Sequence, residues 1–382
     1  MQKSKVALIR VDSYDEQTVL RAFTKGMNLL GGYDEIFGEI QKVLLKPNLL
    51  SPQPPEKSVT THPSVFFAVA QYLKNNRSGL EITYGDSAPK GTTEKILRTT
   101  GIKEVADKLD VSNVNFEEKV TVSNVNGLIH KQFSIAKPVH ETEGLINIAK
   151  LKTHHLTRIS AAVKNIFGVI PGLMKPEFHV KLPGVQEFCQ MLVELNGFVN
   201  AKLHVIDAIV AMEGNGPNAG VPRKLNCLIM SSDPVAADSV SCRLMDLQPD
   251  RVLTNVLGEE NHLGQMTHIE ILGDDLNPLI CRDFQVQRGV ALEANVAWKY
   301  RYLKNLIAIR PVINQTKCIK CGECIRQCPA QPIGINWNKK SGFPEYHYSS
   351  CIRCYCCQEV CPREAIEARK PLIRKIIDRI FS

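Results

Sequence analysis

Two runs of cysteines near the end of the chain carry the most specific chemistry in the sequence. The first run comprises Cys318, Cys321, Cys324 and Cys328, and the second comprises Cys351, Cys354, Cys357 and Cys361. Each run has the spacing C-x2-C-x2-C-x3-C and is followed directly by proline. Three thiolates spaced in this way hold one 4Fe-4S cluster, and the fourth ligates the other cluster. The spacing therefore predicts two clusters, one held by Cys318, Cys321, Cys324 and Cys361 and the other by Cys328, Cys351, Cys354 and Cys357.

Disulfides and structural zinc explain these runs less well. Disulfide frameworks suit small secreted domains, and this chain has 382 residues and no apolar leader segment after Met1. Zinc sites need four ligands in C-x2-4-C pairs and have no requirement for a regular triplet followed by Cys-Pro. Clustered thiols without a leader indicate a reducing compartment, so we predict a cytoplasmic location.

Charge and hydropathy limit the classes of partner. The formal net charge of +8 favours an acidic protein partner or an anionic ligand. The chain has no helix-turn-helix, zinc-finger or basic-aromatic RNA-binding pattern, so nucleic acid is not predicted. No stretch approaches the roughly 18 to 20 apolar residues of a membrane span. Residues 370–382 have the pattern of a basic amphipathic helix, for which packing on protein is favoured over peripheral membrane contact.

Short β-rich segments alternate with helical patterns over residues 1–285. This alternation predicts an α/β domain with a mostly parallel sheet and flanking helices. Predicted strands cover residues 5–11, 42–45, 80–84, 144–150, 203–212, 225–230 and 268–272. Predicted helices cover residues 15–30, 63–76, 92–99, 102–109, 156–169, 185–199 and 233–247. Between 111 and 136, alternating residues around Asn126 and Gly127 predict a hairpin.

The character of the sequence changes at residue 286. Residues 286–311 are predicted to form a helical, basic connector. Residues 312–369 are predicted to form a small α+β domain that binds both clusters and resembles bacterial 2[4Fe-4S] ferredoxins, with a hairpin across 333–348. The predicted helix of residues 370–382 follows this domain.

Polar residues recur directly after the predicted strands of the first domain. In an open parallel sheet the carboxyl ends of the strands share one edge, where ligands bind. Lysines and Gly-rich turns at that edge suit an anion, while His, Asp and Glu suit proton transfer or a hard metal ion. Taken singly, each motif also has an ordinary interpretation as a turn or helix start. The candidate residues are Lys46, Asn48, Asp86, Lys152, His154, Lys164, Asn165, Asp207, Glu213, Asn215, Asp233 and Asp238.

Several of these motifs resemble the domain-of-unknown-function 362 family over roughly residues 40–275. They are Lys46-Pro-Asn48, Thr61-His-Pro63, Gly85-Asp-Ser87, Lys150-Leu-Lys-Thr-His154, Lys164-Asn165, Phe167-Gly168, Glu213-Gly-Asn-Gly-Pro217 and Ser232-Asp-Pro-Val-Ala-Ala-Asp238. The resemblance implies an iron-sulfur protein of mostly anaerobic bacteria and archaea, often with a two-cluster ferredoxin module at the end, and it implies no particular reaction. This chain departs from ordinary ferredoxins in a longer hairpin and in the extra thiol of Cys356, and the spacing favours its neighbour Cys357 as the ligand.

These observations support two main hypotheses for function. In the first, an iron-sulfur electron-transfer protein couples two clusters to a redox reaction or ligand in the first domain, which would make it an oxidoreductase. In the alternative, it is a ferredoxin-like electron carrier whose large domain docks a redox partner protein without catalysis. A weaker third hypothesis is a non-redox transferase with structural clusters. The sequence identifies neither the substrate nor the redox partners.

Overall fold

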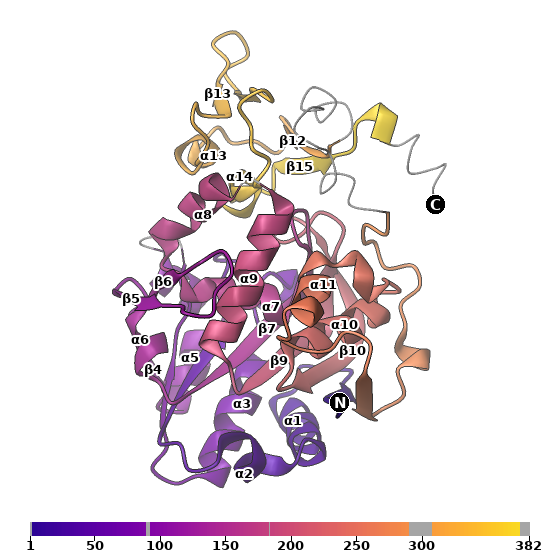
Figure 1. The fold of residues 1–382 in the computed structure, drawn as a ribbon. Coiled ribbons are helices and arrows are strands. Elements are labelled where there is room, and N and C mark those ends of the chain that lie inside the picture. Colours follow the sequence, from indigo (N-terminus) through magenta and orange to yellow (C-terminus); the bar gives the residue numbers. More distant parts are fainter. Residues whose placement is uncertain (1, 89–91, 183, 290–307, 375–382) are drawn as a thin grey trace.

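The computed structural model describes residues 2–88, 92–182, 184–289 and 308–374, which form an α/β domain with a small cysteine-rich domain above it (Figure 1). A nine-stranded sheet runs through the α/β domain in the order β11-β1-β10-β9-β7-β2-β3-β4, with β8 beside β7. Its strands are β1 Ser4–Arg10, β2 Lys42–Pro47, β3 Glu81–Tyr84, β4 Ser112–Asn113, β7 Gly144–His154, β8 Arg158–Ser160, β9 Leu203–Glu213, β10 Val221–Ser231 and β11 Ile269–Gly273. The predicted α/β fold with a mostly parallel sheet is therefore confirmed.

Helices cover both faces of this sheet (Figure 1). On one face lie α1 Glu16–Leu29, α2 Gly32–Phe37, α3 Pro63–Asn76, α4 Thr93–Thr99 and α5 Ile102–Lys108. On the other lie α6 Lys137–Glu141, α7 Ala162–Asn165, α8 Lys175–Lys181, α9 Val185–Val199, α10 Pro234–Leu244 and α11 Leu253–Glu260, together with the hairpin of β5 Lys119–Ser123 and β6 Gln132–Ala136. Short 3-10 helices cover Pro55–Lys57, Ile166–Val169, Gly172–Met174, Pro249–Arg251 and Asn277–Leu279.

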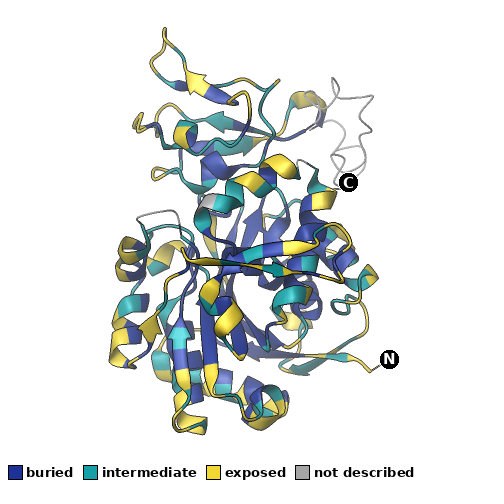
Figure 2. Ribbon diagram, turned by 60° about the vertical axis from the view of Figure 1, so that its left-hand side comes forward, coloured by how far each residue is buried: buried dark blue, intermediate teal, exposed yellow. Residues whose placement is uncertain are grey.

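The core follows from the two-residue period of the strands. Along β1, Ala7 and Ile9 face the layer of α1 and α3, while Val6 and Leu8 face the layer of α10. Both sets are buried, which is why these strands have nearly continuous apolar sequences (Figure 2). Within the described residues, the helices are all too short or too polar to cross a membrane.

The predicted helix over residues 156–169 is wrong in its first half. Strand β7 continues to His154, and β8 turns back along it in antiparallel pairing, with Arg158 opposite His154. Arg158 has φ of 69°, in the left-handed region that an α-helix does not use. The backbone hydrogen bonds of this segment therefore go into a hairpin, and α-helix appears only in Ala162–Asn165.

The sheet contains one reversal that the sequence pattern did not reveal. β10 is antiparallel to both β9 and β1, whereas β7 is parallel to β9 and to β2. The carboxyl end of β10 at Ser231 therefore lies beside His204, at the start of β9. As a result, the segment after β10 lies at the edge opposite the one where β7 and β9 end.

The small domain contains two short sheets and two one-turn helices. Its elements are β12 Arg310–Ile313, α13 Glu323–Arg326, β13 Ile335–Trp337, β14 Pro344–Tyr346, α14 Cys356–Glu359 and β15 Ile366–Arg369. The predicted hairpin corresponds to β13 and β14. Most of the predicted connector, residues 290–307, and residues 375–382 of the predicted C-terminal helix lie outside the described residues.

Hydrogen bonds from the loop after β9 attach the small domain to the sheet edge. Asn215 Oδ1 accepts from Gln358 Nε2 at 2.9 Å and from the Ala368 N–H at 3.2 Å. Asn215 Nδ2 also donates to the Ile366 carbonyl at 3.2 Å. The candidate Asn215 is therefore a contact between the domains, and it holds the small domain over the carboxyl ends of β7 and β9 (Figure 1).

Candidate functional site

A pocket of about 130 Å³ lies between the two domains. The small domain contributes α14 and the residue just after α13, and the α/β domain contributes the ends of β7 and the loops after β2 and β3. The polar and sulfur-bearing side chains around it are Asn48, Asp86, Ser87, Lys152, His154, Ser160, Lys164, Asn165, Lys175, His179, Gln327, Cys356 and Glu359. Six of the candidates named from the sequence thus line one pocket: Asn48, Asp86, Lys152, His154, Lys164 and Asn165.

The wall formed by the loops after β2 and β3 contains a buried ion pair. Lys46 Nζ lies 2.9 Å from Asp86 Oδ1, and the two side chains are 0% and 6% exposed. Burial lowers the pKa of Lys46, and the charge of Asp86 opposes that shift. A Cβ atom on Gly168 would lie 2.0 Å from Asp86 Oδ1 and 2.5 Å from Lys46 Nζ. The Gly168 backbone therefore approaches this ion pair so closely that no side chain fits.

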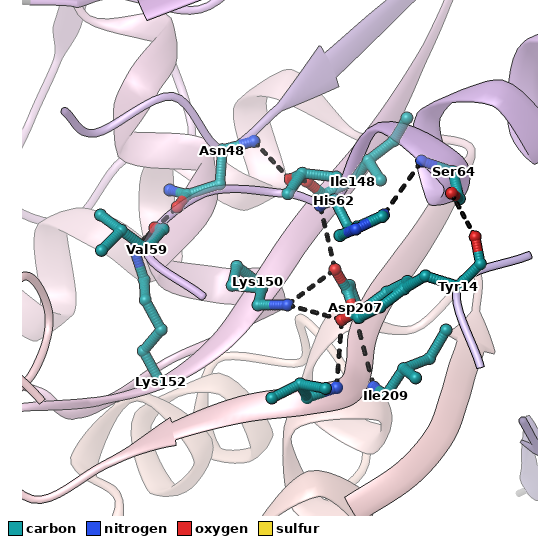
Figure 3. A network of polar contacts seen from close by, with 12 residues as sticks. Tyr14, Asn48, Val59, His62, Ser64, Ile148, Lys150, Lys152, Asp207 and Ile209 are labelled. Carbon is teal, nitrogen blue, oxygen red and sulfur yellow. Dashed lines mark hydrogen bonds and ion pairs between the residues drawn. The ribbon is translucent and has the colours of Figure 1, made fainter. Parts of the chain in front are cut away.

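Lys152 is buried beside the pocket and has only neutral hydrogen-bond partners. Its Nζ donates to Asn48 Oδ1 and to the Val59 carbonyl, both at 2.7 Å (Figure 3). Burial, opposed by the more distant charge of Glu359, lowers its pKa to about 7. Asn48 in turn donates to Asn165 Oδ1 at 2.9 Å, which fixes the amide that receives Lys152.

Two further lysines line the pocket without a carboxylate partner. Lys164 Nζ lies 4.7 Å from the centre of the Phe167 ring, and Lys175 Nζ donates to the Ser87 carbonyl at 2.6 Å. Burial lowers the pKa of Lys164, and it lowers that of Lys175 to about 8. Within the described part of the chain, neither these two lysines nor Lys152 forms an ion pair with a carboxylate. The pocket therefore has an excess of positive charge.

His154 and Glu359 meet across the domain boundary. His154 Nδ1 accepts from the backbone N–H groups of Leu156 and Thr157 at 3.1 and 3.3 Å. Burial lowers the pKa of His154, so the ring is neutral and carries its proton on Nε2. That Nε2 lies 3.3 Å from Glu359 Oε1. Burial alone raises the pKa of Glu359, but the His154 contact and the charge of Lys164 bring it down to about 2.

The cysteines of the first predicted cluster surround a second, smaller cavity. Cys318, Cys321, Cys324 and Cys361 line it together with apolar residues that include Ile313 and Ile366. The Ala365 N–H donates to Cys361 Sγ at 3.3 Å. An apolar cavity with thiols on its walls suits an iron-sulfur cluster, whose potential depends on hydrogen bonds to sulfur and on burial.

The cysteines of the second predicted cluster also gather in the small domain. Cys351 interacts electrostatically with Cys328 and Cys354, and Cys357 with Cys354. Tyr346 donates its hydroxyl to Cys357 Sγ at 3.1 Å. In the described residues, no group of three or more His, Cys, Asp or Glu side chains is arranged for a single metal ion. A cubane is larger than one ion, and its ligands lie farther apart.

Cys356 and its neighbour Cys357 lie in different surroundings. Its side chain lines the interdomain pocket, whereas Cys357 packs in the apolar centre of the small domain with Cys324. This arrangement supports Cys357 as the cluster ligand. Gln327 and Cys356, which line the pocket, directly precede Cys328 and Cys357 in the chain. The second cysteine group therefore lies beside the pocket.

The remaining candidates lie elsewhere. Asp207 is fully buried in the middle of the sheet, where it accepts from Lys150 Nζ at 2.9 Å and from the Tyr14 hydroxyl at 2.8 Å (Figure 3). Glu213 accepts from the Gln285 N–H at 2.9 Å on the far side of the loop after β9. These contacts brace the sheet and its edge and leave neither carboxylate in the pocket.

Asp233 and Asp238 are helix-capping residues. Asp233 Oδ1 accepts from the Val235 and Ala236 N–H groups at 2.8 and 2.9 Å, and so caps α10. Its predicted place with the other strand ends is wrong, because β10 is antiparallel and ends at the opposite edge. Asp238 accepts from the Ala162 and Val163 N–H groups at the start of α7, and burial raises its pKa to about 7.

Lys175, His179 and Glu359 line the pocket but were not among the candidates named from the sequence. Lys175 and His179 lie on α8, between the predicted helices of residues 156–169 and 185–199, where no helix was predicted. Pro176 in the first turn of α8 was the available signal for that helix. Glu359 carries no signal of its own, because it meets His154 only when the small domain docks.

Comparison with known proteins agrees with this two-part structure. A 4Fe-4S dicluster domain matches residues 310–362, so the protein is an iron-sulfur protein. The family described as Domain of unknown function (DUF362) matches residues 43–243, and the chain belongs to that family.

One curated relative is a thylakoid-associated protein of Synechocystis sp., 32% identical over 250 residues, which are 65% of this chain and 77% of that protein. Two solved structures show a limited likeness of fold. A structural-genomics target from Thermotoga maritima has a TM-score of 0.38 and 14% identity over 62% of this chain and 60% of its own. The lactate racemase apoprotein of Thermoanaerobacterium thermosaccharolyticum has a TM-score of 0.39 and 13% identity over 63% of this chain and 57% of its own.

Proposed function

We propose that this protein transfers electrons through two 4Fe-4S clusters to an anionic ligand bound between its two domains. The observation that carries the proposal is the group of three lysines, Lys152, Lys164 and Lys175, around a pocket that lies beside the second cysteine group. The clusters supply one-electron transfer when bound. Ligands for the first would be Cys318, Cys321, Cys324 and Cys361, and for the second Cys328, Cys351, Cys354 and Cys357.

The charge of the pocket selects the class of ligand. Buried ammonium groups without carboxylate partners are costly, and an anion that enters the pocket compensates them. Asp86 is already paired with Lys46, and Glu359 lies 3.3 Å from the neutral ring of His154 and forms no ion pair with a lysine in the described residues. The three lysines are therefore available to a small carboxylate, a phosphate or a similar anion.

The residues that touch the pocket also suggest how protons and electrons reach the ligand. His154 carries its proton on Nε2 at the wall of the pocket, where Glu359 orients the ring. Cys356 and Gln327 bring the backbone beside the second cysteine group to the same wall. Reduction of an anion that also takes up a proton is chemistry that this arrangement can support.

The alternative function is a carrier whose large domain only docks a redox partner. The pocket argues against it, because a docking surface has no need for three buried lysines around a cavity. The two functions differ in one measurable property, which is saturable binding of a small anion between the domains.

Calorimetric titration of the anaerobically purified protein with sulfate tests the proposal. Sulfate keeps a constant charge near neutral pH and serves as the probe. We expect binding to one site, weakened about tenfold or more in Lys164→Met because a buried charge pair is lost. The exposed Lys74→Met is the matched control and should bind as the wild type does. Equal binding by both variants, or no binding by the wild type, contradicts the proposal.

The clustered thiols support a cytoplasmic location. The Synechocystis relative is named as thylakoid-associated, so association with a membrane is the competing location. Fractionation of cells that produce the full chain distinguishes the two, and we expect the protein in the fraction without membranes.

A further inference from the structure

The small domain exposes one edge of the first cysteine group. Of the eight predicted cluster ligands, Cys321 is the one that is exposed. Two large apolar residues lie near it and are also in contact with solvent, Ile319 at 55% and Trp337 at 47% exposure. The Trp337 ring lies against Gly322, directly after Cys321. Figure 2 shows the exposed strand β13 at the end of the small domain that points away from the large sheet.

Positive charges surround this apolar spot. Lys317, Lys320 and Arg363 are exposed, and Arg363 lines the cavity of the first cysteine group together with Ile319. Within the described residues none of the three forms an ion pair. The acidic side chains close by are already engaged, Glu323 with Arg326, Glu364 with Lys57, and Glu367 with Arg369 and, through a weaker electrostatic interaction, with Lys317.

We propose that this surface is the docking face for an acidic electron-donor protein. We call it the entry face, and it consists of Lys317, Ile319, Lys320, Trp337 and Arg363. An apolar centre with a charged rim is typical of transient redox interfaces, which are small and depend on complementary charge. These exposed cations, none of which forms an ion pair in the described residues, select a partner with an acidic surface, and the exposed thiol of the first group makes a redox protein the fitting partner.

The step at the entry face is a single-electron exchange. The reduced donor would lose one electron, and a cluster held by Cys318, Cys321, Cys324 and Cys361 would gain it, with no bond made or broken. This inference rests on the proposed placement of that cluster. It adds a direction to the proposed function, because the entry face adjoins the first cysteine group, whereas the interdomain pocket is lined by Gln327 and Cys356, the direct neighbours of two cysteines of the second group.

Anaerobic stopped-flow mixing with a chemically reduced, acidic [2Fe-2S] ferredoxin tests the entry face. The variant Lys317→Glu/Arg363→Glu reverses two of its charges. The control Lys74→Glu/Lys95→Glu makes the same change on exposed lysines of α3 and α4 in the α/β domain. Iron and sulfide contents, reduction by dithionite, and calorimetric affinity for the oxidised ferredoxin are measured for each protein.

At low ionic strength we expect the second-order rate constant to fall about tenfold or more in the entry-face variant and to stay within about twofold in the control. Affinity for oxidised ferredoxin should fall in parallel, and added salt should bring the rates of wild type and variant together. Equal rates in wild type and variant, or equal slowing in both variants, overturn the proposal.

The same experiment separates this inference from the proposed function. A wild-type protein without clusters removes the proposed function. If the clusters are intact but the second-order rate constant does not change when the charges are reversed, the entry face is refuted and the proposed function is not. If charge reversal lowers the iron content, the neutral variant Lys317→Gln/Arg363→Gln is used instead. We expect its second-order rate constant to lie between those of the wild type and the charge-reversed variant. An unchanged rate constant contradicts the proposal.

Discussion

Lys152 gives the interdomain pocket a dependence on pH that can be worked out from its surroundings. Burial lowers its pKa to about 7, and the charges that act on it are Glu359 and Asp86, which raise the pKa, and Lys164 and Lys150, which lower it. If a bound anion needs the charged ammonium group of Lys152, the affinity of the pocket for that anion is greatest below pH 7 and falls as the pH rises. One pKa unit corresponds to about 1.4 kcal/mol, or about a tenfold change in affinity.

The expected size of this effect is large. Between pH 7 and pH 9 the affinity for sulfate should fall about 50-fold, because about half of Lys152 is charged at its pKa of about 7 and about 1% is charged two units higher. Lys175, with a pKa of about 8, adds to the fall above pH 8. Calorimetric titration of the wild type and of Lys152→Met across this range measures the effect. The variant should bind more weakly at pH 7 and show a shallower fall.

The same pKa shift has a consequence for stability with a defined sign. The folded-state pKa of Lys152 lies below that of the unfolded chain, so protons favour unfolding. Above about pH 10.5 the lysine is neutral in both states and its lowered pKa imposes no cost on folding. As the pH falls, the unfolded chain takes up a proton that the folded protein does not, so the free energy of unfolding decreases down to about pH 7 and is constant below that. The cost near pH 7 is roughly 4 kcal/mol from the difference between the two pKa values.

An affinity for sulfate that stays constant between pH 6.5 and 9 would refute the reasoning.

Four further substitutions test individual parts of the structure. Cys357→Ala should lower the iron content by about half, while Cys356→Ala should leave it unchanged, because the first residue is predicted to ligate the second cluster and the second faces the pocket; equal iron loss in both counts against this assignment. Gly168→Ala should destabilise the protein by about 1–3 kcal/mol, since its Cβ overlaps the Lys46–Asp86 pair, and an unchanged thermal midpoint argues against that packing. Asp233→Ala should lower the free energy of unfolding by about 1 kcal/mol through loss of the α10 cap and should leave the affinity for sulfate unaltered. A loss of sulfate affinity would indicate that Asp233 contributes to the pocket.

The sequence was most informative where the chemistry is local. Cysteine spacing is fixed by the geometry of a cluster over about ten residues, so it can be recognised without knowledge of the fold. The alternation of strands and helices likewise predicted the α/β domain. Lys152 and His154 were recognised because they follow a predicted strand, and Lys164 was recognised from its motif with Asn165 in a predicted helix; the pocket brings all three together.

Sequence analysis failed where distant segments decide the arrangement. Nothing in residues 221–231 distinguishes a parallel from an antiparallel strand, and the reversal of β10 carried Asp233 to the opposite edge. The β7–β8 hairpin overrode a helical apolar spacing because its backbone groups pair with β7. Glu359 reaches the pocket through the docking of another domain, which no local pattern encodes.

The central claim is that an anion in the interdomain pocket and an electron on the second cluster influence each other. An anaerobic redox titration followed by EPR, with and without saturating sulfate, measures this coupling directly. Sulfate neutralises the lysines that favour added negative charge, so the potential of one cluster should fall by about 60 mV for each tenfold difference in affinity, and the shift should vanish in Lys164→Met. Identical potentials in both conditions for the wild-type protein, with sulfate bound, would contradict the account.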